Sequence, residues 1–162
     1  MIQIEHLVKN YGSNCAVDDI SLSIGEGEIV GFLGPNGAGK STTMNILTGY
    51  LSSTAGRVSV AGIDVLGDPL NAKKQIGYLP EERGLYKKMK VGEQALFLAR
   101  LKGLSRYEAL VRLKEWFIRF GIEDWWDKKV EDLSKGMAQK IQFIVTVLHQ
   151  PKLLIFDEPF SG

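Results

Sequence analysis

Several features that would point to a particular class of protein are scarce in this chain of 162 residues. It holds one cysteine, Cys15, so it forms no internal disulfide, which fits a reducing, cytosolic setting. No apolar run approaches the roughly 20 residues needed to span a bilayer, and the first residues lack the layout of a signal peptide. The net charge of +1 argues neither for nor against a nucleic-acid partner. Any role at a membrane is therefore expected to need a partner protein.

The composition that is present suits a soluble globular core, with 44% hydrophobic and 24% charged residues. Alternating or continuous apolar runs predict strands over 2–8, 20–24, 28–34, 57–62, 76–79 and 153–157. Apolar residues at helical spacing predict helices over 40–50, 92–103, 108–121 and 136–150. SRYE at 105–108 is a capping-box pattern, with serine followed three residues later by glutamate. The sequence therefore predicts an α/β body with a helical insertion.

One stretch, GPNGAGKST at 34–42, matches the pattern G-x-x-x-x-G-K-[ST] between an expected buried strand and an expected helix. Glycines let such a loop curl so that backbone N–H groups point at phosphate oxygens, and the helix N-terminus adds partial positive charge. Lys40 is expected to reach the β- and γ-phosphates, Ser41 to bind Mg²⁺, and Thr42 to support the α-phosphate. The predicted nucleotide-binding residues are Gly34, Pro35, Asn36, Gly37, Ala38, Gly39, Lys40, Ser41 and Thr42. The alternative is a glycine-rich turn that matches the pattern by chance.

Two adjacent carboxylates, Asp157 and Glu158, follow an apolar run near the end of the sequence. In enzymes with a phosphate loop, an acid at the end of a buried strand holds Mg²⁺. A buried carboxylate pair without a cation would be costly, because charges are expensive to remove from water. We therefore expect Asp157 to bind the metal and Glu158 to act in catalysis by orienting or deprotonating the attacking water. The alternative is a solvated turn before Pro159.

Together these motifs resemble, over essentially the whole chain, the ATP-binding subunit of ABC transporters. Between the loop and the carboxylates lies LSKGM at 133–137, which is similar to the family signature LSGGQ and opens a predicted helix. Lys135 and Met137 depart from that signature, adding a cation and removing an amide. The resemblance implies that four residues face the γ-phosphate of ATP held by a second copy: Ser134, Lys135, Gly136 and Met137. A simple helix-capping role for Ser134 is compatible with this.

The resemblance also assigns residues around the base and the γ-phosphate. Tyr11 lies where the family has an aromatic residue that stacks on adenine, with Val17 nearby, although a strand-end tyrosine also suits packing at a sheet edge. Glu81 stands where the family has a glutamine that contacts Mg²⁺ and the attacking water, and the alternative is a solvated turn residue. The surrounding stretch GYLPEERGLY, 77–86, resembles a branch of export-type subunits.

For the fold, the resemblance implies a sheet core like that of phosphate-loop NTPases, with an N-terminal antiparallel β subdomain and a helical subdomain. Residues 1–84 would form the core with the β subdomain and the Walker A loop, and 85–135 the helical subdomain ending in the signature. Residues 136–162 would return to the core with the Walker B acids. Family members continue with a strand that lies between the phosphate-loop strand and LLIFD. We therefore expect a truncated subunit whose hydrolysis is impaired even where nucleotide binds.

The implied function is an ATP-binding and ATP-hydrolysing subunit that powers a membrane transporter, an exporter by analogy, with ATP and Mg²⁺ as cofactors. Its implied partners are a second nucleotide-binding subunit, forming a homodimer, and transmembrane permease subunits, with no nucleic acid. It would lie in the cytoplasm, held at the inner face of the membrane through the permease. Two alternatives stay open. One is a soluble ABC-class ATPase without a transport role, and the other is a nucleotide-binding module without turnover.

Overall fold

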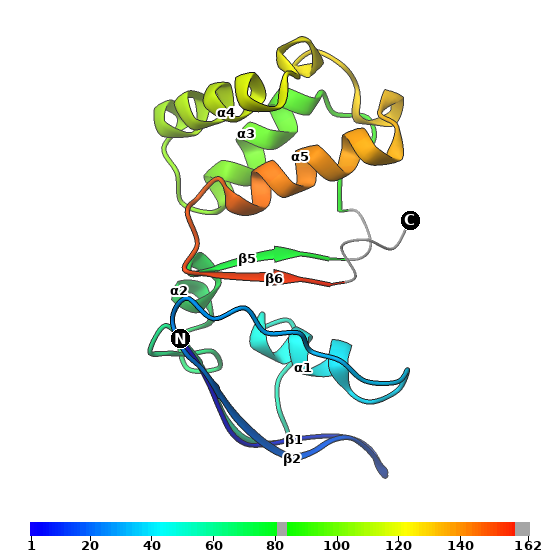
Figure 1. The fold of residues 1–162 in the computed structure, drawn as a ribbon, viewed down its shortest axis with the longest axis vertical. Coiled ribbons are helices and arrows are strands. Elements are labelled where there is room, and N and C mark those ends of the chain that lie inside the picture. Colours follow the sequence, from blue (N-terminus) through cyan, green and yellow to red (C-terminus); the bar gives the residue numbers. More distant parts are fainter. Residues whose placement is uncertain (81–83, 158–162) are drawn as a thin grey trace. The chain divides into compact units, whose positions relative to one another are not determined.

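The computed structural model describes residues 1–80 and 84–157 and divides the chain into two compact units. The first unit runs from Met1 to Ile76 and the second from Gly77 to Gly162. Figure 1 shows a sheet with short helices in the first unit, and longer helices beside a pair of strands in the second. Both units therefore mix strands and helices, which confirms the predicted α/β class.

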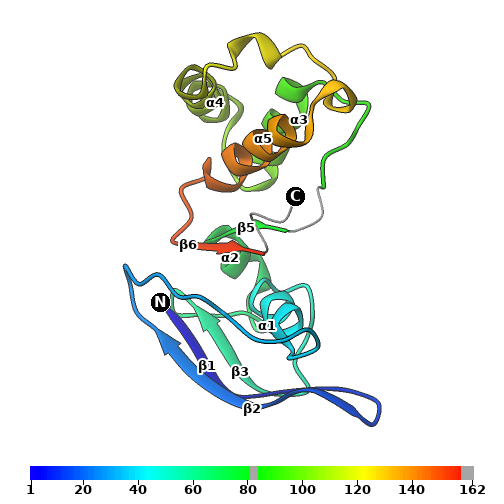
Figure 2. The same ribbon diagram turned by 45° about the vertical axis from the view of Figure 1, so that its right-hand side comes forward.

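The first unit is built on a four-stranded sheet in the order β2-β1-β3-β4. Its strands are β1 (Ile2–Tyr11), β2 (Asn14–Ile24), β3 (Ala55–Val60) and β4 (Ile63–Asp64). All three neighbouring pairs are antiparallel, and Figure 2 shows β1, β2 and β3 side by side. The antiparallel N-terminal subdomain implied by the family resemblance is thus confirmed.

A bulge in β1 decides which of its side chains reach the core. Ile2 and Ile4 are buried, as their alternation predicts, and the next residue on that face would be His6. His6 has a positive φ of 49°, and the register between β1 and β2 shifts between Ile4 and Leu7. Leu7 is therefore the buried residue, and His6 stays exposed with its Nδ1 atom 2.8 Å from a carboxylate oxygen of Asp19.

Two helices belong to the first unit. Helix α1 (Lys40–Leu47) was predicted, and its end near Gly49 agrees with the sequence, since the Gly49 N–H donates to the Ile46 carbonyl at 3.0 Å. Helix α2 (Pro69–Lys74) was not predicted. Its sequence signal was present in Asp68, which caps the helix by accepting from the N–H of Asn71, followed by proline at the first helical position.

The predicted buried strand over 28–34 is wrong for the described structure. This stretch has no strand assignment, and its side chains are largely exposed, with Ile29 at 101% and Leu33 at 92% relative exposure. A strand forms only where a neighbouring strand accepts and donates its backbone hydrogen bonds. In the described residues one sheet is β2-β1-β3-β4 and the other pairs β5 (Ile76–Leu79) with β6 (Leu153–Phe156), and neither includes this stretch. Apolar composition alone therefore did not predict burial here, because the described strands offer this stretch no pairing partner.

The second unit pairs β5 (Ile76–Leu79) with β6 (Leu153–Phe156), and the two arrows run in the same direction in Figure 1. Its helices are α3 (Val91–Leu101), α4 (Arg106–Phe120) and α5 (Lys135–Val147). Two short 3-10 helices, Glu123–Trp125 and Val130–Asp132, lie between α4 and α5. The strands β5 and β6 and the helices α3, α4 and α5 match the predicted ones within a few residues at each end, whereas the two 3-10 helices were not predicted.

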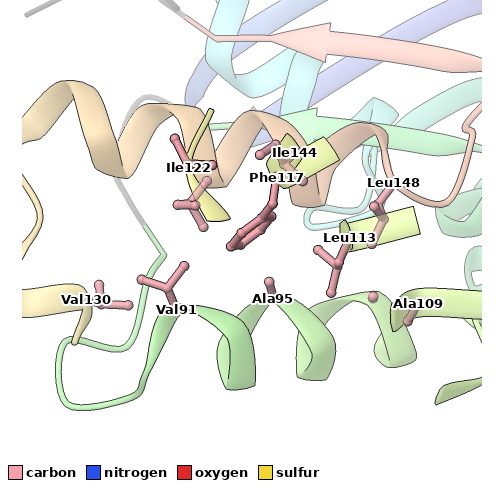
Figure 3. Packing of buried hydrophobic residues seen from close by; sticks show 11 residues of the cluster. Val91, Ala95, Ala109, Leu113, Phe117, Ile122, Val130, Ile144 and Leu148 are labelled. Atoms are coloured by element: carbon pink, nitrogen blue, oxygen red, sulfur yellow. The ribbon is translucent and has the colours of Figure 1, made fainter. Parts of the chain in front are cut away.

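The helices of the second unit enclose one hydrophobic cluster, shown in Figure 3. Leu113 and Phe117 of α4 face Val91 and Ala95 of α3 there, because residues three or four apart lie on one face of a helix. Its buried members are Val91, Ala95, Ala99, Ala109, Leu113, Phe117, Ile122, Val130, Ile141, Ile144 and Leu148. This cluster packs α5, the helix that begins in the predicted signature segment, against α3 and α4.

Candidate functional site

The phosphate loop of the first unit ends in the N-terminus of α1. The Ala38 N–H donates to the Pro35 carbonyl at 3.2 Å, which closes a turn within the loop. Gly37 and Gly39 have φ angles of 84° and 81°, which lie in a backbone region that residues other than glycine rarely adopt. The Thr43 N–H then donates to the Gly39 carbonyl at 2.9 Å as the helix starts. The sequence pattern thus folds into a curled loop before a helix, as phosphate binding requires.

Gly39 is also held in place by the start of β2. A Cβ atom on Gly39 would collide with the backbone carbonyl oxygen of Ala16 and would lie 3.3 Å from a methyl group of Val17. Val17 is itself buried, so its side chain packs beneath the loop. The sequence reasoning did not find the role of Ala16. No local pattern marks a backbone carbonyl that lies against Gly39, more than 20 positions away in the chain.

Lys40 folds back over the loop it follows. Its ammonium nitrogen donates to the carbonyls of Gly34 and Pro35, at 2.6 and 2.8 Å. Ser41 is exposed in the first turn of α1, and Thr42 beside it is half-buried. The remaining predicted loop residues Asn36, Gly37 and Ala38 are exposed as well. The predicted phosphate-binding residues therefore lie together in one exposed loop, and the Lys40 ammonium is bound to two carbonyls of that loop.

Tyr11 stands at the end of β1 in the same unit, where it pairs with Asn14 of β2. Its side chain is half-exposed, so packing at the sheet edge covers only part of the ring. The ammonium nitrogen of Lys9 lies over the ring, 5.1 Å from the ring centroid. Lys9 was not singled out in the sequence, although period-two alternation in a strand places it on the same face as Tyr11.

The predicted signature segment lies at the start of α5 in the second unit. Ser134 is the N-cap of this helix, and its hydroxyl accepts from the Met137 N–H at 3.3 Å. Lys135 is the first helical residue, and Ser134, Lys135 and Gly136 are all exposed. The capping role of Ser134 is confirmed, and the role of the segment toward a second copy stays a prediction.

Asp157 follows β6 directly, as the sequence predicts. Its N–H donates to the Leu79 carbonyl at 3.0 Å, and the Tyr78 hydroxyl donates to its carboxylate oxygen Oδ2 at 3.2 Å. Tyr78 is a residue that the sequence reasoning missed, although a half-buried tyrosine hydroxyl usually needs a partner. Lys40 and Asp157 belong to different units, and their meeting around one nucleotide is part of the proposal below.

Two predicted site residues, Glu81 and Glu158, lie outside the described residues. Within residues 1–80 and 84–157, no three histidine, cysteine or acidic side chains gather into a group that could hold a metal ion. The Ser41 hydroxyl and the Asp157 carboxylate are nevertheless oxygen donors of the type that Mg²⁺ prefers when phosphates and water complete its shell. The donor chemistry therefore fits magnesium bound together with a nucleotide.

A family model described as "ABC transporter" matches residues 17–161 of this chain. The chain belongs to the ABC transporter family. The ABC transporter ATP-binding protein YhaQ of Bacillus subtilis (strain 168) is 53% identical over 162 residues, which are 100% of this chain and 53% of YhaQ. A solved structure of an ATP-binding subunit of an ABC transporter has a TM-score of 0.90 at 32% identity and covers 99% of this chain and 67% of its own. CbiO1 from Clostridium perfringens, part of the ABC transporter complex cbiONQ, has a TM-score of 0.83 at 28% identity, covering 99% and 66%.

These likenesses confirm the fold predicted for an ABC ATP-binding subunit. The chain spans about half the length of the curated relatives it matches, with 53% of YhaQ and 57% of the Methanocaldococcus jannaschii protein MJ1023. None of the helices in the described residues is both long and apolar enough to cross a membrane. The division into residues 1–84, 85–135 and 136–162 and the roles of the site residues stay predictions.

Proposed function

We propose that this chain is the ATP-binding and ATP-hydrolysing part of a subunit that powers a membrane ABC transporter. The observation that carries the proposal is the phosphate loop, with positive φ angles at Gly37 and Gly39 and with Lys40 opening α1. Membership of the family supports ATP as the nucleotide. The direction of transport, export, rests on the resemblance of GYLPEERGLY to export-type subunits.

Phosphate binding would begin at the N-terminus of α1. Lys40 would exchange its two carbonyl acceptors, on Gly34 and Pro35, for oxygens of the β- and γ-phosphates. Charge-assisted hydrogen bonds to phosphate are stronger than those to neutral carbonyls, so the exchange favours the bound state. Thr42 would support the α-phosphate. Backbone N–H groups of the curled loop would surround the remaining phosphate oxygens.

Ser41 and Asp157 would hold Mg²⁺, with Glu81 as the third predicted ligand. When bound, this ion supplies positive charge that offsets the negative charge developing on the phosphates during transfer. The Tyr78 hydroxyl holds one carboxylate oxygen of Asp157 at 3.2 Å, which fixes the direction of the ligand. Glu158 would orient or deprotonate the attacking water.

A second copy of the subunit would complete the hydrolytic site. The exposed N-terminus of α5, with Ser134 and Gly136, would face the γ-phosphate held by the partner copy, since helix N-termini favour anions. Lys135 would add a positive charge there. Met137 is half-buried and its backbone N–H donates to the Ser134 hydroxyl, so it would act by holding Ser134 at the start of the helix.

The membrane would be reached through permease subunits, and the protein would then lie in the cytoplasm at the inner face of the membrane. The second unit offers a surface for such a contact in a groove of about 540 Å³ beside the turn between α3 and α4. Phe97 and Leu101 are exposed there next to the cations of Arg100 and Arg106. Exposed apolar groups beside charged ones suit a protein interface.

The two competing functions differ from this proposal in turnover and in partners. A nucleotide-binding module would bind Mg-ATP without steady-state hydrolysis. A soluble ABC-class ATPase would hydrolyse ATP without co-purifying with membrane subunits. The described residues contain no long coiled-coil helix of the kind a soluble chromosome-associated ATPase needs, because the longest helix, α4, has 15 residues.

The first experiment is a thermal melt of the chain with and without Mg-ATP. A ligand present at about 100 times its dissociation constant stabilises a folded binding site by about 2.7 kcal/mol. We expect the melting temperature to rise with Mg-ATP in the wild type. Lys40→Ala, which removes the cation at the mouth of the loop, should lose this rise.

The matched control is Lys73→Ala, which removes a lysine of α2 from the same unit and should leave the rise intact. A rise of equal size in Lys40→Ala would contradict the phosphate-loop assignment. A cooperative melt with no response to Mg-ATP in the wild type would show that this chain alone does not form the site.

A further inference from the structure

The end of β1 carries an aromatic ring with a cation on one face. The ammonium nitrogen of Lys9 lies 5.1 Å from the centroid of the Tyr11 ring, within the distance at which a cation and an aromatic ring attract each other. Half of the Tyr11 side chain is exposed, at 50%. One face of the ring is thus covered by Lys9, and exposed ring surface is left for a further stacking partner.

Lys9 is held in this position from the other side. Its ammonium nitrogen donates to the Ser52 carbonyl at 2.8 Å. The adjacent backbone is fixed to the same segment, because the Asn10 N–H donates to the Thr54 hydroxyl at 2.9 Å and the Thr54 N–H donates to the Val8 carbonyl at 2.8 Å. The segment around Ser52 follows α1, the helix that starts in the phosphate loop. The position of the cation is therefore tied to the structure that continues from the loop.

A cation over a tyrosine ring is not by itself a sign of a binding site. Lys73 places its ammonium nitrogen 5.1 Å from the ring centroid of Tyr50 in the same unit, with no sequence motif beside it. The register of the sheet distinguishes Tyr11. Lys9 pairs with Val17, and Val17 together with the Ala16 carbonyl touches Gly39 of the phosphate loop. The Lys9–Tyr11 pair thus lies on the strand next to the one that supports the loop.

We propose that Lys9 is a positioning residue for the base of the bound nucleotide: it holds one face of Tyr11 so that the other face stacks on the adenine. This inference rests on the proposed function, since it needs a nucleotide in the phosphate loop. Lys9 covers one face and restricts the motion of the ring, which lowers the entropy that stacking would otherwise cost. Its charge is bound to Ser52 and Tyr11, so it acts on the base through the ring.

Lys9→Met tests the inference in the full-length protein, because methionine keeps an unbranched side chain and removes the charge. We expect the dissociation constant for ATP, measured by calorimetry at about 0.15 M salt, to rise by about threefold. The dissociation constant for inorganic tripolyphosphate, which has no base, should not change. Lys9→Arg should restore ATP affinity, because a guanidinium also lies over aromatic rings.

A double-mutant cycle with Tyr11→Ala separates positioning from a general effect on the sheet. If Lys9 acts through the ring, Lys9→Met should have no further effect on ATP affinity once the ring is gone. Lys73→Met is the matched control, because it removes the equivalent cation from Tyr50 and should leave ATP affinity unchanged. Equal weakening of ATP and tripolyphosphate binding by Lys9→Met would overturn the inference, as would an unchanged affinity for ATP.

The outcome for Lys9 is distinguishable from the outcome for the proposed function. If the phosphate-loop assignment is wrong, Lys40→Ala will retain its affinity for ATP. Failure of the base contact alone would appear as retained ATP affinity in Tyr11→Ala, while Lys40→Ala still loses binding of both ATP and tripolyphosphate.

Discussion

Gly39 controls the phosphate loop through its backbone and through the space it leaves open. Its φ angle of 81° is unfavourable for any side chain, and a Cβ atom would collide with the Ala16 carbonyl. We expect Gly39→Ala to lower the free energy of unfolding by about 1 to 2 kcal/mol from the φ angle and by about 1 to 3 kcal/mol more from the collision. Urea unfolding followed by circular dichroism measures the sum.

Gly37→Ala is the matched control for this change. Gly37 has a similar φ angle of 84°, but a Cβ atom there would meet nothing within 4 Å. It should therefore show only the first part of the loss. Equal losses at Gly37 and Gly39 would show that contact with β2 does not constrain the loop.

The residues of the candidate site that the sequence predicted are those marked by local patterns. Lys40, Ser41 and Thr42 follow fixed spacing after the loop glycines, and Asp157 follows an apolar run. Tyr78 was missed because its partner, the Asp157 carboxylate, is 79 positions away along the chain. Contacts of this kind leave no periodic trace in a sequence.

At the scale of elements, the start of α4 combines a helix cap with a charge. Ser105 and Glu108 form a capping box, in which the Glu108 N–H donates to the Ser105 hydroxyl and the Ser105 N–H donates to the Glu108 carboxylate. Hydrogen bonds from the side chain and the backbone of Ser105 lower the pKa of Glu108 below its ordinary value of 4.5. The ionised carboxylate is thus favoured in the folded state.

This shift predicts a pH dependence of stability. A carboxylate with a lowered pKa in the folded state stabilises the protein above its unfolded pKa, and this contribution is lost as the pH falls through the folded pKa. The difference in melting temperature between wild type and Glu108→Gln should therefore be constant near neutral pH. It should shrink as the pH falls below 4.5. A difference that stays constant as the pH falls through this range would contradict the expectation.

Arg112 connects two helices of the second unit. Its guanidinium Nη1 donates to the Leu148 carbonyl at 2.9 Å, at the C-terminal end of α5, where cations are favourable. We expect Arg112→Ala to lower the free energy of unfolding by about 1 to 2 kcal/mol, because a charge-assisted hydrogen bond is lost. Chemical denaturation of wild type and variant measures the difference.

Lys114→Ala, at an exposed position of α4, is the comparison for Arg112→Ala. A loss in Arg112→Ala no larger than in Lys114→Ala would mean that the bond to α5 contributes nothing measurable.

The helices α3, α4 and α5 were predicted because each is long enough to show its apolar spacing. Helix α2, with 6 residues, is too short for that signal and is marked only by its cap.

At the scale of the whole molecule, the stretch 28–34 is the main departure from the expected fold. It is apolar in composition and exposed, with no strand partner in the described residues. We expect its amide hydrogens to exchange with solvent faster than those of β1 and β3 in this chain. In a full-length protein of the family, the additional chain should supply a partner strand and slow this exchange. Hydrogen–deuterium exchange with mass spectrometry compares the two.

Slow exchange over 28–34 in this chain would contradict the first expectation, because it would require backbone partners that the described strands do not offer. Fast exchange in the full-length protein would contradict the second. The exchange of β1 serves as the internal reference in both cases, since it pairs on both sides with β2 and β3.

By itself the sequence determined the features that depend on near neighbours. The phosphate loop, the capping box at Ser105 and the apolar run before Asp157 are each set by residues a few positions apart, so local propensity is enough to predict them. Only the tertiary structure decided that 28–34 stays unpaired, that Leu7 replaces His6 in the core, and that the Lys9 ammonium is held by the Ser52 carbonyl. These depend on which distant strand lies alongside, and hydrogen bonding and packing between strands settle that after the local elements have formed.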